Sequence, residues 1–551
     1  MAIPTLYDMC QSQTIVNMRA GLWSQCQENP FTRVPPKLVD KLREFIFSLN
    51  FRQLPNREAL HLLFTSHRLK KLDLSCFFVD TGETFSESDP YAPSHLKMDI
   101  DKKKKKSSMG FYYCDILPDG SDVYSRTKKH MEDECNSLLY MLSKDPQPDL
   151  QSFVMTEATN VSKFALQLLI QVSTHLTEIH TCLNWFDLNF LMNYKTLRIL
   201  RLHDKTLPRN CSTEFLEACE KVLPSLENLE TFTICNSRID CFGIRPLIAI
   251  ALAHCPKLTS VGSLDSAMAI DFVKSKLDES HTGCLRLKTC FWGFEGNCQS
   301  FLRRREMLNL KSIFPELINT AVSRCPFVEE LILQVLHKDC LQHLRRLKRL
   351  SFLCLDYEYC EDFDLVECFS SLGEIRHQLK HFLIKRNDSM GAYHKFPLNV
   401  VIDNCENLET LGVLELSAID LPLETNTRFR RLKRICISMT SDYLGQILRY
   451  CDDLTYLVIV GEFRVDESEL QENLSHVSAL KLQTLGVRSP YFTRNAMRMV
   501  FEKAPNLERV CFSLRMESGQ TLLRELGRSI FFYDELLIEN CFPPELQRCI
   551  F

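Results

Sequence analysis

The sequence predicts an α/β solenoid, in which short parallel strands alternate with helices, and three observations support this. One apolar pattern recurs along the chain: an apolar residue, two free positions, a second apolar residue, one free position and a third. The last two apolar residues of each copy are two positions apart, so they point to one face of a strand. Successive copies have a spacing that suits one strand plus one helix. Those beginning at Leu379, Leu408, Leu432, Leu454, Leu482 and Leu507 stand 29, 24, 22, 28 and 25 residues apart.

The copies that carry all three apolar residues run through most of the chain. They are Leu69/Leu72/Leu74, Leu197/Leu200/Leu202, Leu229/Phe232/Ile234, Val328/Leu331/Leu333, Leu347/Leu350/Phe352, Leu379/Phe382/Ile384, Leu408/Leu411/Val413, Leu432/Ile435/Ile437, Leu454/Leu457/Ile459, Leu482/Leu485/Val487 and Leu507/Val510/Phe512. Such a period indicates a leucine-rich-repeat solenoid, a horseshoe with parallel strands on the concave face and helices on the convex face.

The segments between the strands have the character of short helices. Pro246 to His254, Pro315 to Arg324 and Pro397 to Asn404 each begin with proline, which is favoured in the first turn of a helix. Several of these helices end in a cysteine just before the next strand. These cysteines are Cys255, Cys325, Cys405 and Cys451. We expect them to act as small core residues.

Composition restricts the class of protein. The chain has 551 residues, a net charge of −4 and 25 cysteines. The charge gives no overall attraction to nucleic acid, and no apolar run is long enough to span a membrane. The first residues lack the basic start and apolar run of a signal peptide. We therefore expect a reduced protein of the cytoplasm, the nucleus or both, with no nucleic acid or membrane partner.

The chain divides into three predicted regions. Residues 1–50 form a helical module, residues 51–514 form the solenoid, and residues 515–551 form a C-terminal cap or tail. The register is lost at about residues 76–130, where polar stretches and the run Lys102 to Lys106 predict a mobile insertion. That lysine run is interpreted as a solvated loop, with a nuclear-import signal or a phosphate-binding patch as alternatives.

Two short patterns mark the helical module. In the first, Thr5 and Leu6 are followed by three free positions and then Cys10. This resembles the first half of a VHL box, the module that joins substrate receptors to Elongin C and Cullin-2. The family has an apolar residue four positions after the cysteine, whereas this chain has Thr14 there and the apolar Ile15 next to it.

The second pattern is an apolar residue, proline, two free positions, an apolar residue, three free positions and another apolar residue. Val34, Pro35, Leu38 and Leu42 match it, and it resembles the Cullin-2 box. Together the two patterns resemble those of the VHL-box leucine-rich-repeat receptors related to the zygote-defective family. The armadillo repeats of those relatives are not seen here, so their target preference is not carried over.

The resemblance implies a substrate-recognition subunit of a cullin–RING ubiquitin ligase. Thr5, Leu6 and Cys10 would bind Elongin C of the Elongin B/C pair. Val34, Pro35, Leu38 and Leu42 would bind Cullin-2, which brings a RING subunit.

Two alternatives remain for the helical module. Residues 34–42 also resemble the first helix of an F-box, which would join the chain to the F-box adaptor and Cullin-1 as in F-box leucine-rich-repeat proteins. Residues 1–50 could instead be a plain cap of a ligase-independent scaffold or inhibitor. The cap predicts complete packing onto the first repeat, whereas a docking helix predicts partial exposure of Leu6, Cys10 and Leu38.

The residue between the two inward apolar positions of each strand should face the concave side, where solenoids bind partners. The residues at this position are Asp73, Val154, His180, Arg201, Thr233, Gly262, Phe291, Ile332, Ser351, Leu383, Gly412, Cys436, Val458, Gly486 and Cys511. Charge is confined to the first part of this line. We expect Arg201, Phe291, Ile332, Leu383 and Val458 to contact a target, the last four as an exposed apolar strip. The alternative is that the tail or a helix covers the strip.

Motifs for chemistry are missing from the sequence. It contains no Gly-rich phosphate loop, nucleophile elbow, HExxH or paired CxxC. His337, Cys340 and His343 could share a helical face, but no fourth metal ligand is within reach in the sequence. We expect no metal, no cofactor and no catalysis by this chain alone.

Overall fold

The structure is a computed structural model of the chain. With short gaps inside several ranges, it describes residues 10–18, 28–48, 62–73, 139–155, 163–182, 191–203, 213–235, 244–276, 284–293, 304–357, 360–385, 395–420, 431–512 and 531–532. Internal contacts divide the chain into an N-terminal unit, residues 2–239, and a C-terminal unit, residues 240–551. The predicted insertion at 76–130, the run Lys102 to Lys106 and nearly all of the predicted tail at 515–551 lie outside the described residues.

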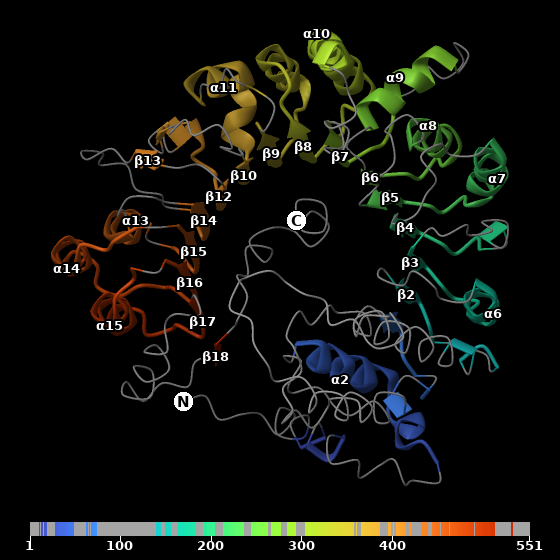
Figure 1. The fold of residues 1–551 in the computed structure, drawn as a ribbon, viewed down its shortest axis with the longest axis horizontal. Helices are drawn as coiled ribbons and strands as arrows, with labels where there is room; N and C mark the ends of the chain where they lie inside the picture. The colour runs from blue at the N-terminus through green and yellow to red at the C-terminus, as the bar shows by residue number, and fades with distance from the viewer. Residues whose placement is uncertain are drawn as a thin grey trace, which may run out of the picture. The chain divides into compact units, whose positions relative to one another are not determined.

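The N-terminal unit contains a parallel sheet of consecutive strands (Figure 1). The strands are β1 (Lys71–Asp73), β2 (Ser152–Met155), β3 (Glu178–Cys182), β4 (Ile199–His203) and β5 (Thr231–Cys235). Its helices are η1 (Pro30–Arg33), α2 (Pro36–Ser48), α6 (Lys163–Val172), α7 (Thr213–Val222) and η6 (Leu223–Ser225).

The C-terminal unit repeats this arrangement over more strands. Its parallel sheet runs through β6 (Ser260–Gly262), β7 (Thr289–Trp292), β8 (Glu330–Gln334), β9 (Phe352–Asp356), β10 (His381–Lys385), β12 (Thr410–Leu414), β14 (Arg434–Ser438), β15 (Tyr456–Val460), β16 (Thr484–Arg488), β17 (Arg509–Phe512) and β18 (Phe531–Phe532). A separate parallel pair joins β11 (Lys395–Pro397) and β13 (Ala418–Asp420).

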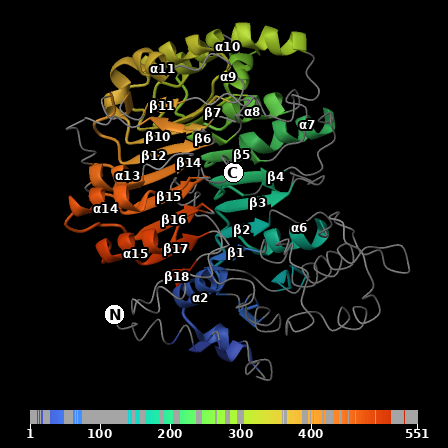
Figure 2. The ribbon, with the colours of Figure 1, turned by 60° about the vertical axis from the view of Figure 1, so that its left-hand side comes forward.

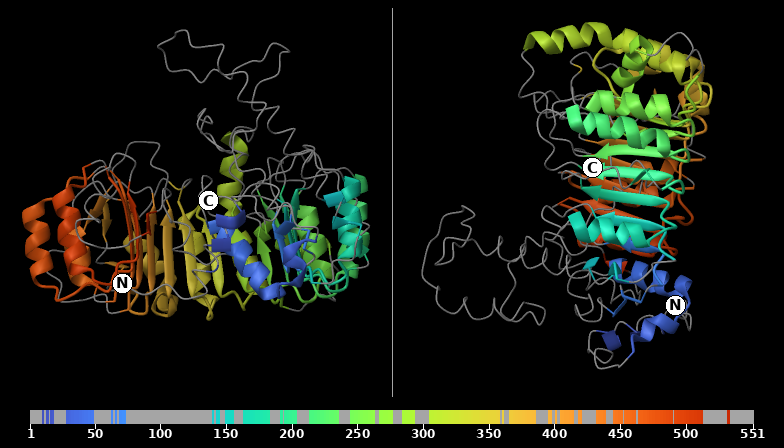
Figure 3. Two further views of the ribbon diagram at one scale, coloured as in Figure 1. Left: turned by 90° about the horizontal axis from the view of Figure 1, so that it is seen from below. Right: turned by 90° about the vertical axis from the view of Figure 1, so that its right-hand side faces the viewer.

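Helices alternate with the strands of the C-terminal unit and lie on one face of its sheet (Figures 2 and 3). They are α8 (Ile244–His254), α9 (Ser266–Lys276), α10 (Arg304–Arg324), η8 (Lys338–Arg346), α11 (Leu365–Leu372), η9 (Gly373–Gln378), α13 (Leu444–Tyr450), α14 (Glu467–Ser475) and α15 (Arg494–Lys503). Parallel strands separated by helices, at the spacing of the apolar pattern, confirm the predicted α/β leucine-rich-repeat fold.

The apolar pattern forms the core because its residues align across neighbouring strands. Leu411 and Val413 of β12 pair in register with Ile435 and Ile437 of β14, and all four are buried. Just before the strands, the carbonyl of Glu409 accepts the N–H groups of Lys433 at 2.9 Å and of Arg434 at 3.1 Å. The same two-donor arrangement recurs between other repeats, so each strand begins on the backbone of its predecessor.

The four cysteines before the strands are core residues, as predicted. Each is buried and donates its N–H to the carbonyl four residues earlier, for example Cys255 to Ala251 at 2.9 Å. Burial raises the pKa of the Cys255 and Cys405 thiols to about 12. A thiol with such a pKa is protonated at neutral pH and therefore unreactive.

Three details of the sequence interpretation were wrong. In β9 the aligned residues are Leu353 and Leu355, so Cys354, and not Ser351, occupies the position of Ile332 in β8. Pro315 lies inside the 21-residue helix α10 and not in its first turn. Pro397 ends strand β11 instead of opening a helix.

Candidate functional site

The helical module is held against the segment that leads into β1. The side-chain amide of Asn29 donates to the carbonyl of Leu62, and Arg68 Nε donates to the carbonyl of Thr32 at 2.9 Å. Asp40 of α2 accepts the backbone N–H of Lys70 at 3.0 Å. Burial raises the pKa of the Asp40 carboxyl, against the lowering effect of this hydrogen bond. These contacts fix α2 next to the first strand.

The first box-like segment, which begins with Thr5, Leu6 and Cys10, has residues that are open to solvent. Cys10 and Val16 are helical and exposed, with 54% of Val16 accessible, whereas Met18 is fully buried. Successive residues of a helix turn by about 100°, so Val16, two positions before Met18, lies on the opposite side of the helix. Thr5 and Leu6 lie outside the described residues.

The second box is split between an exposed and a buried part. Pro35 is exposed, Val34 is half-buried, and Leu38 of α2 is 43% exposed. Leu42 is only 7% exposed and shares the buried side of α2 with Val39. Pro35 and Leu38 are therefore available to a partner, while Leu42 mainly anchors the helix.

The predicted apolar strip is not exposed. Phe291, Ile332, Leu383 and Val458 are buried and belong to one apolar cluster in the C-terminal unit. The cluster also includes Phe352, Cys354, Leu414, Cys436 and Tyr456. The expectation of an open strip is thus wrong, and the alternative of a covered strip fits the burial. A role of these residues in target binding stays a prediction.

A steric constraint favours glycine at position 486, next to this cluster. Gly486 pairs with Val458 in the ladder of β15 and β16. A Cβ atom at Gly486 would lie 3.1 Å from Val458 Cγ2, closer than ordinary van der Waals contact. The small residue lets the larger Val458 pack, so alternation of small and large side chains fills this row of the cluster.

The corresponding face of the N-terminal unit is polar. Glu178 and His180 project from the same face of β3, and His180 Nε2 lies 2.7 Å from Glu178 Oε1. Burial alone would raise the pKa of Glu178, but the close contact with His180 lowers it to about 2. Lys71 and Asp73 of β1 form another ion pair, at 3.9 Å.

Arg201 differs from these paired groups. It lies on β4 between His180 of β3 and Thr233 of β5, its register partners. The side chain is half-buried, and among the described residues neither its guanidinium nor the Thr233 hydroxyl has a hydrogen-bond or ion-pair partner. Arg201 is therefore the sequence-predicted target residue whose charge stays available.

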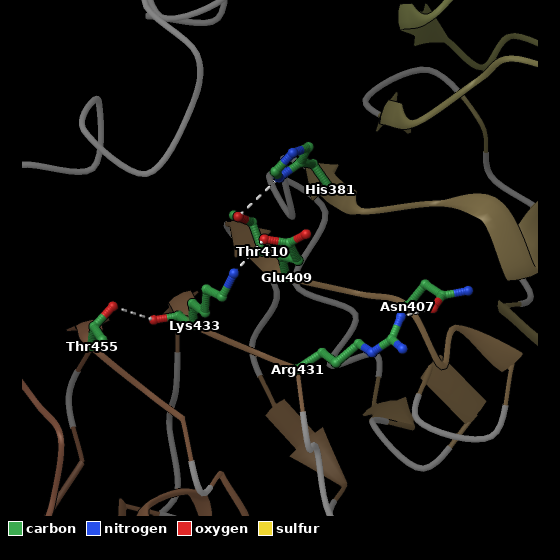
Figure 4. A network of polar contacts seen from close by, with 7 residues as sticks. All are labelled: His381, Asn407, Glu409, Thr410, Arg431, Lys433 and Thr455. Carbon is green, nitrogen blue, oxygen red and sulfur yellow. Dashed lines mark hydrogen bonds and ion pairs between the residues drawn. The ribbon is translucent and has the colours of Figure 1, made fainter.

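A row of polar residues lies at the beginnings of several strands of the C-terminal unit, just before them or as their first residue (Figure 4). Lys433 Nζ donates to Glu409 Oε2 at 2.8 Å, and the Thr455 hydroxyl donates to the Lys433 carbonyl at 3.1 Å. Beside them, His381 Nδ1 lies 3.0 Å from Thr410 Oγ1. The Lys433 hydrogen bond lowers the pKa of Glu409, and burial lowers that of His381. This row links neighbouring repeats and pairs its own charges.

The candidate metal ligands do not converge. Cys340 is fully buried in η8, whereas the side chain of His337 is 43% exposed and accepts the backbone N–H of Asp339. Within the described ranges, no group of three or more His, Cys, Asp or Glu side chains is arranged to hold a metal ion. No helix in the part of the chain that the structure describes is both long and apolar enough to cross a membrane.

No protein-family model and no curated protein sequence matches this chain. Among solved structures, the yeast Rad7 and Elc1 complex is 15% identical, with 74% of this chain and 87% of that chain covered and a TM-score of 0.39. An internalin from Listeria monocytogenes is 14% identical, with 72% and 89% covered and a TM-score of 0.29. The leucine-rich repeat-containing protein LegL7 from Legionella pneumophila is 14% identical, with 45% and 87% covered and a TM-score of 0.26. The fold assignment rests on the strand register itself.

Proposed function

We propose that this chain is the substrate-recognition subunit of a cullin–RING ubiquitin ligase and works in the cytoplasm or nucleus. One observation carries the proposal. In both box-like segments, residues matching the adaptor pattern are exposed while neighbouring apolar residues hold the segment in place. Cys10 and Leu38 are exposed, whereas Met18 and Val39 are fully buried.

The first helix would bind Elongin C in a helix-in-groove contact. Such contacts use one apolar helix face that is open in the free protein. Cys10 and Val16 are both exposed, and we expect Leu6 to join them in this contact. Pro35 and Leu38 would then contact Cullin-2 alongside the adaptor, with Val34 at the edge of that contact.

The chain would contribute to catalysis only through proximity. The repeats would hold a target, and the RING subunit on the cullin would bring the ubiquitin-charged enzyme close to the target's lysines. Holding two reactants together raises their effective concentration, so a receptor needs no reactive group of its own. This fits the buried, protonated thiols Cys255 and Cys405.

A ligase-independent scaffold is the second candidate. The contact of Asp40 with Lys70 and the burial of Leu42 favour it, because both are expected of a helix that caps the first strand segment. An F-box-type receptor of a Cullin-1 ligase would use the same exposed α2 surface.

Co-expression of the full chain with each adaptor set separates these candidates. One set holds Elongin B/C with Cullin-2, and the other holds the F-box adaptor with Cullin-1. We expect co-purification with the first set and loss of the complex for Cys10→Asp. Co-purification with only the second set would move the chain to the F-box arm. If the folded chain forms neither complex, the ligase-independent scaffold would be the remaining candidate.

A further inference from the structure

We propose that Arg201 and Thr233 form a carboxylate-binding subsite that selects an acidic residue in an extended target segment. The inference rests on the proposed role of the repeats as the target-binding part of the protein. It names the chemistry of the target, which the adaptor boxes do not determine.

The guanidinium of Arg201 is half-buried and carries a charge that no described group compensates. A guanidinium that is half-buried has lost part of its hydration, and this is unfavourable unless an anion or acceptor replaces the water. Arg201 has no such partner among the described residues. By contrast, Arg198 at the start of the same strand segment forms two hydrogen bonds with Glu230, at 2.9 and 2.7 Å.

A second hydrogen-bond donor, the Thr233 hydroxyl, lies on the strand next to Arg201. Thr233 is directly beside Arg201 in the ladder of β4 and β5, and neighbouring strands lie about 4.8 Å apart. Its hydroxyl has no partner among the described residues, although the residue is buried. A guanidinium and a hydroxyl at this spacing can both donate to one carboxylate, and arginine matches the planar geometry of that group.

The neighbouring strand β3 carries a carboxylate, Glu178, two residues before His180, the register partner of Arg201. Glu178 would be the natural internal partner of Arg201, but its carboxylate already lies 2.7 Å from His180 Nε2. Lys71 and Asp73 also form an ion pair with each other. The charge of Arg201 is therefore the one left uncompensated among these groups, and the face is complementary to a single added negative charge.

The same charges exclude a phosphate dianion as the preferred ligand. A doubly charged phosphate needs more than one cation, and here the fixed negative charge of Glu178 lies one row away. A single carboxylate balances Arg201 alone. The net charge of −4 gives the protein no general attraction for acidic peptides, so any preference for them would come from this local site.

Selection of random peptides by the full-length chain tests the inference. A displayed library is selected against the wild-type chain, Arg201→Met and the charge-matched control Arg198→Met. Peptides recovered by the wild type and by Arg198→Met should share Asp or Glu at one recurring position, and those recovered by Arg201→Met should not. Recovery without an acidic position, or an acidic position that persists with Arg201→Met, would overturn the subsite.

Individual peptides from the selection make the test quantitative. Replacing the recurring Glu by Gln should weaken binding to the wild type by roughly tenfold or more, and leave binding to Arg201→Met nearly unchanged. Thr233→Val should give a smaller loss with the same coupling. A phosphoserine at that position that binds better than Glu would contradict the preference for a carboxylate.

Adaptor binding is measured on the same variants. Arg201→Met should bind Elongin B/C like the wild type, because the substitution lies on the strand face of β4. Failure of the peptide test with intact adaptor binding would overturn only the subsite. Failure of adaptor binding by the wild type would overturn only the ligase proposal.

Discussion

At the scale of single residues, stability depends on the apolar positions of the repeat. Phe382 of β10 is 1% exposed, and its ring packs against that of Phe369 of α11 with centroids 5.2 Å apart. Phe382→Ala should lower the free energy of unfolding by about 3–5 kcal/mol, because it removes a buried ring and leaves a cavity. Urea unfolding followed by circular dichroism measures the loss. Val366→Ala, at a position 53% exposed, should change it by less than about 0.5 kcal/mol.

The pair of half-buried Glu178 and buried His180 makes stability depend on pH. The pKa of Glu178 is lowered from 4.5 to about 2 in the folded chain. A lowered pKa means that the stabilisation is complete above the unfolded value and is lost as the pH falls toward the folded one. The wild type should therefore exceed Glu178→Gln in stability at about pH 6, and this advantage should shrink as the pH falls through about 4 to 3. An advantage that grows on acidification would contradict the assignment.

The apolar pattern could be predicted from the sequence because the buried positions of each repeat require apolar side chains. Leu411 and Val413 must face the helices, so their spacing appears in every copy. The pattern is ambiguous where apolar residues continue, and this explains the error at β9. Leu347, Leu350, Phe352, Leu353 and Leu355 are all buried, so the sequence fits two registers and only the ladder with β8 selects one.

The availability of Arg201 could be predicted only in part. The sequence places it on the strand face, because it lies between Leu200 and Leu202, which are buried on the other face. It does not show that Glu178 is already paired with His180, because the alternation along a strand gives the face of each side chain but not its contacts. The sequence also does not show that the apolar strip is buried, because its side chains, such as Phe291 and Leu383, belong to a cluster that spans several strands.

At the scale of elements, helix ends show how the repeats fix their connections. Thr493 precedes α15, and its hydroxyl accepts the N–H of Ala496 at 3.1 Å. Thr493→Ala should reduce stability by about 1 kcal/mol, because the first turn of the helix loses a capping acceptor. Thr493→Ser keeps the hydroxyl and should remain close to the wild type in the same thermal unfolding measurement. Equal losses in both variants would show that the methyl group matters more than the cap.

Helix α2 has a buried and an exposed face, and paired substitutions test whether the two faces have separate roles. Leu42→Ala should lower stability by about 2–5 kcal/mol because this side chain is buried. Leu38→Asp should leave the melting temperature unchanged but weaken Cullin-2 binding by roughly tenfold or more, because Leu38 is exposed. Differential scanning fluorimetry and binding of the purified adaptor complex to Cullin-2 measure the two effects. Unfolding of the Leu38 variant would assign this face to the fold.

At the scale of the whole molecule, the repeats and the helical module supply different parts of one proposed activity. The leucine-rich-repeat architecture provides strand faces that differ in chemistry, apolar and filled in the C-terminal unit and polar in the N-terminal unit. The module at residues 1–50 exposes Cys10, Val16 and Leu38, which we propose bind the adaptor and the cullin. A target and an adaptor could then be bound at the same time.

Calorimetric titration of the full-length chain with purified Elongin B/C tests the central claim most directly. The account predicts a one-to-one complex that Cys10→Asp abolishes while its circular dichroism and melting temperature match the wild type. Leu38→Asp should still bind Elongin B/C, because its effect is confined to the cullin contact. An absence of binding by a folded wild-type chain, or equally tight binding by Cys10→Asp, would contradict the claim that the exposed helix face is the adaptor site.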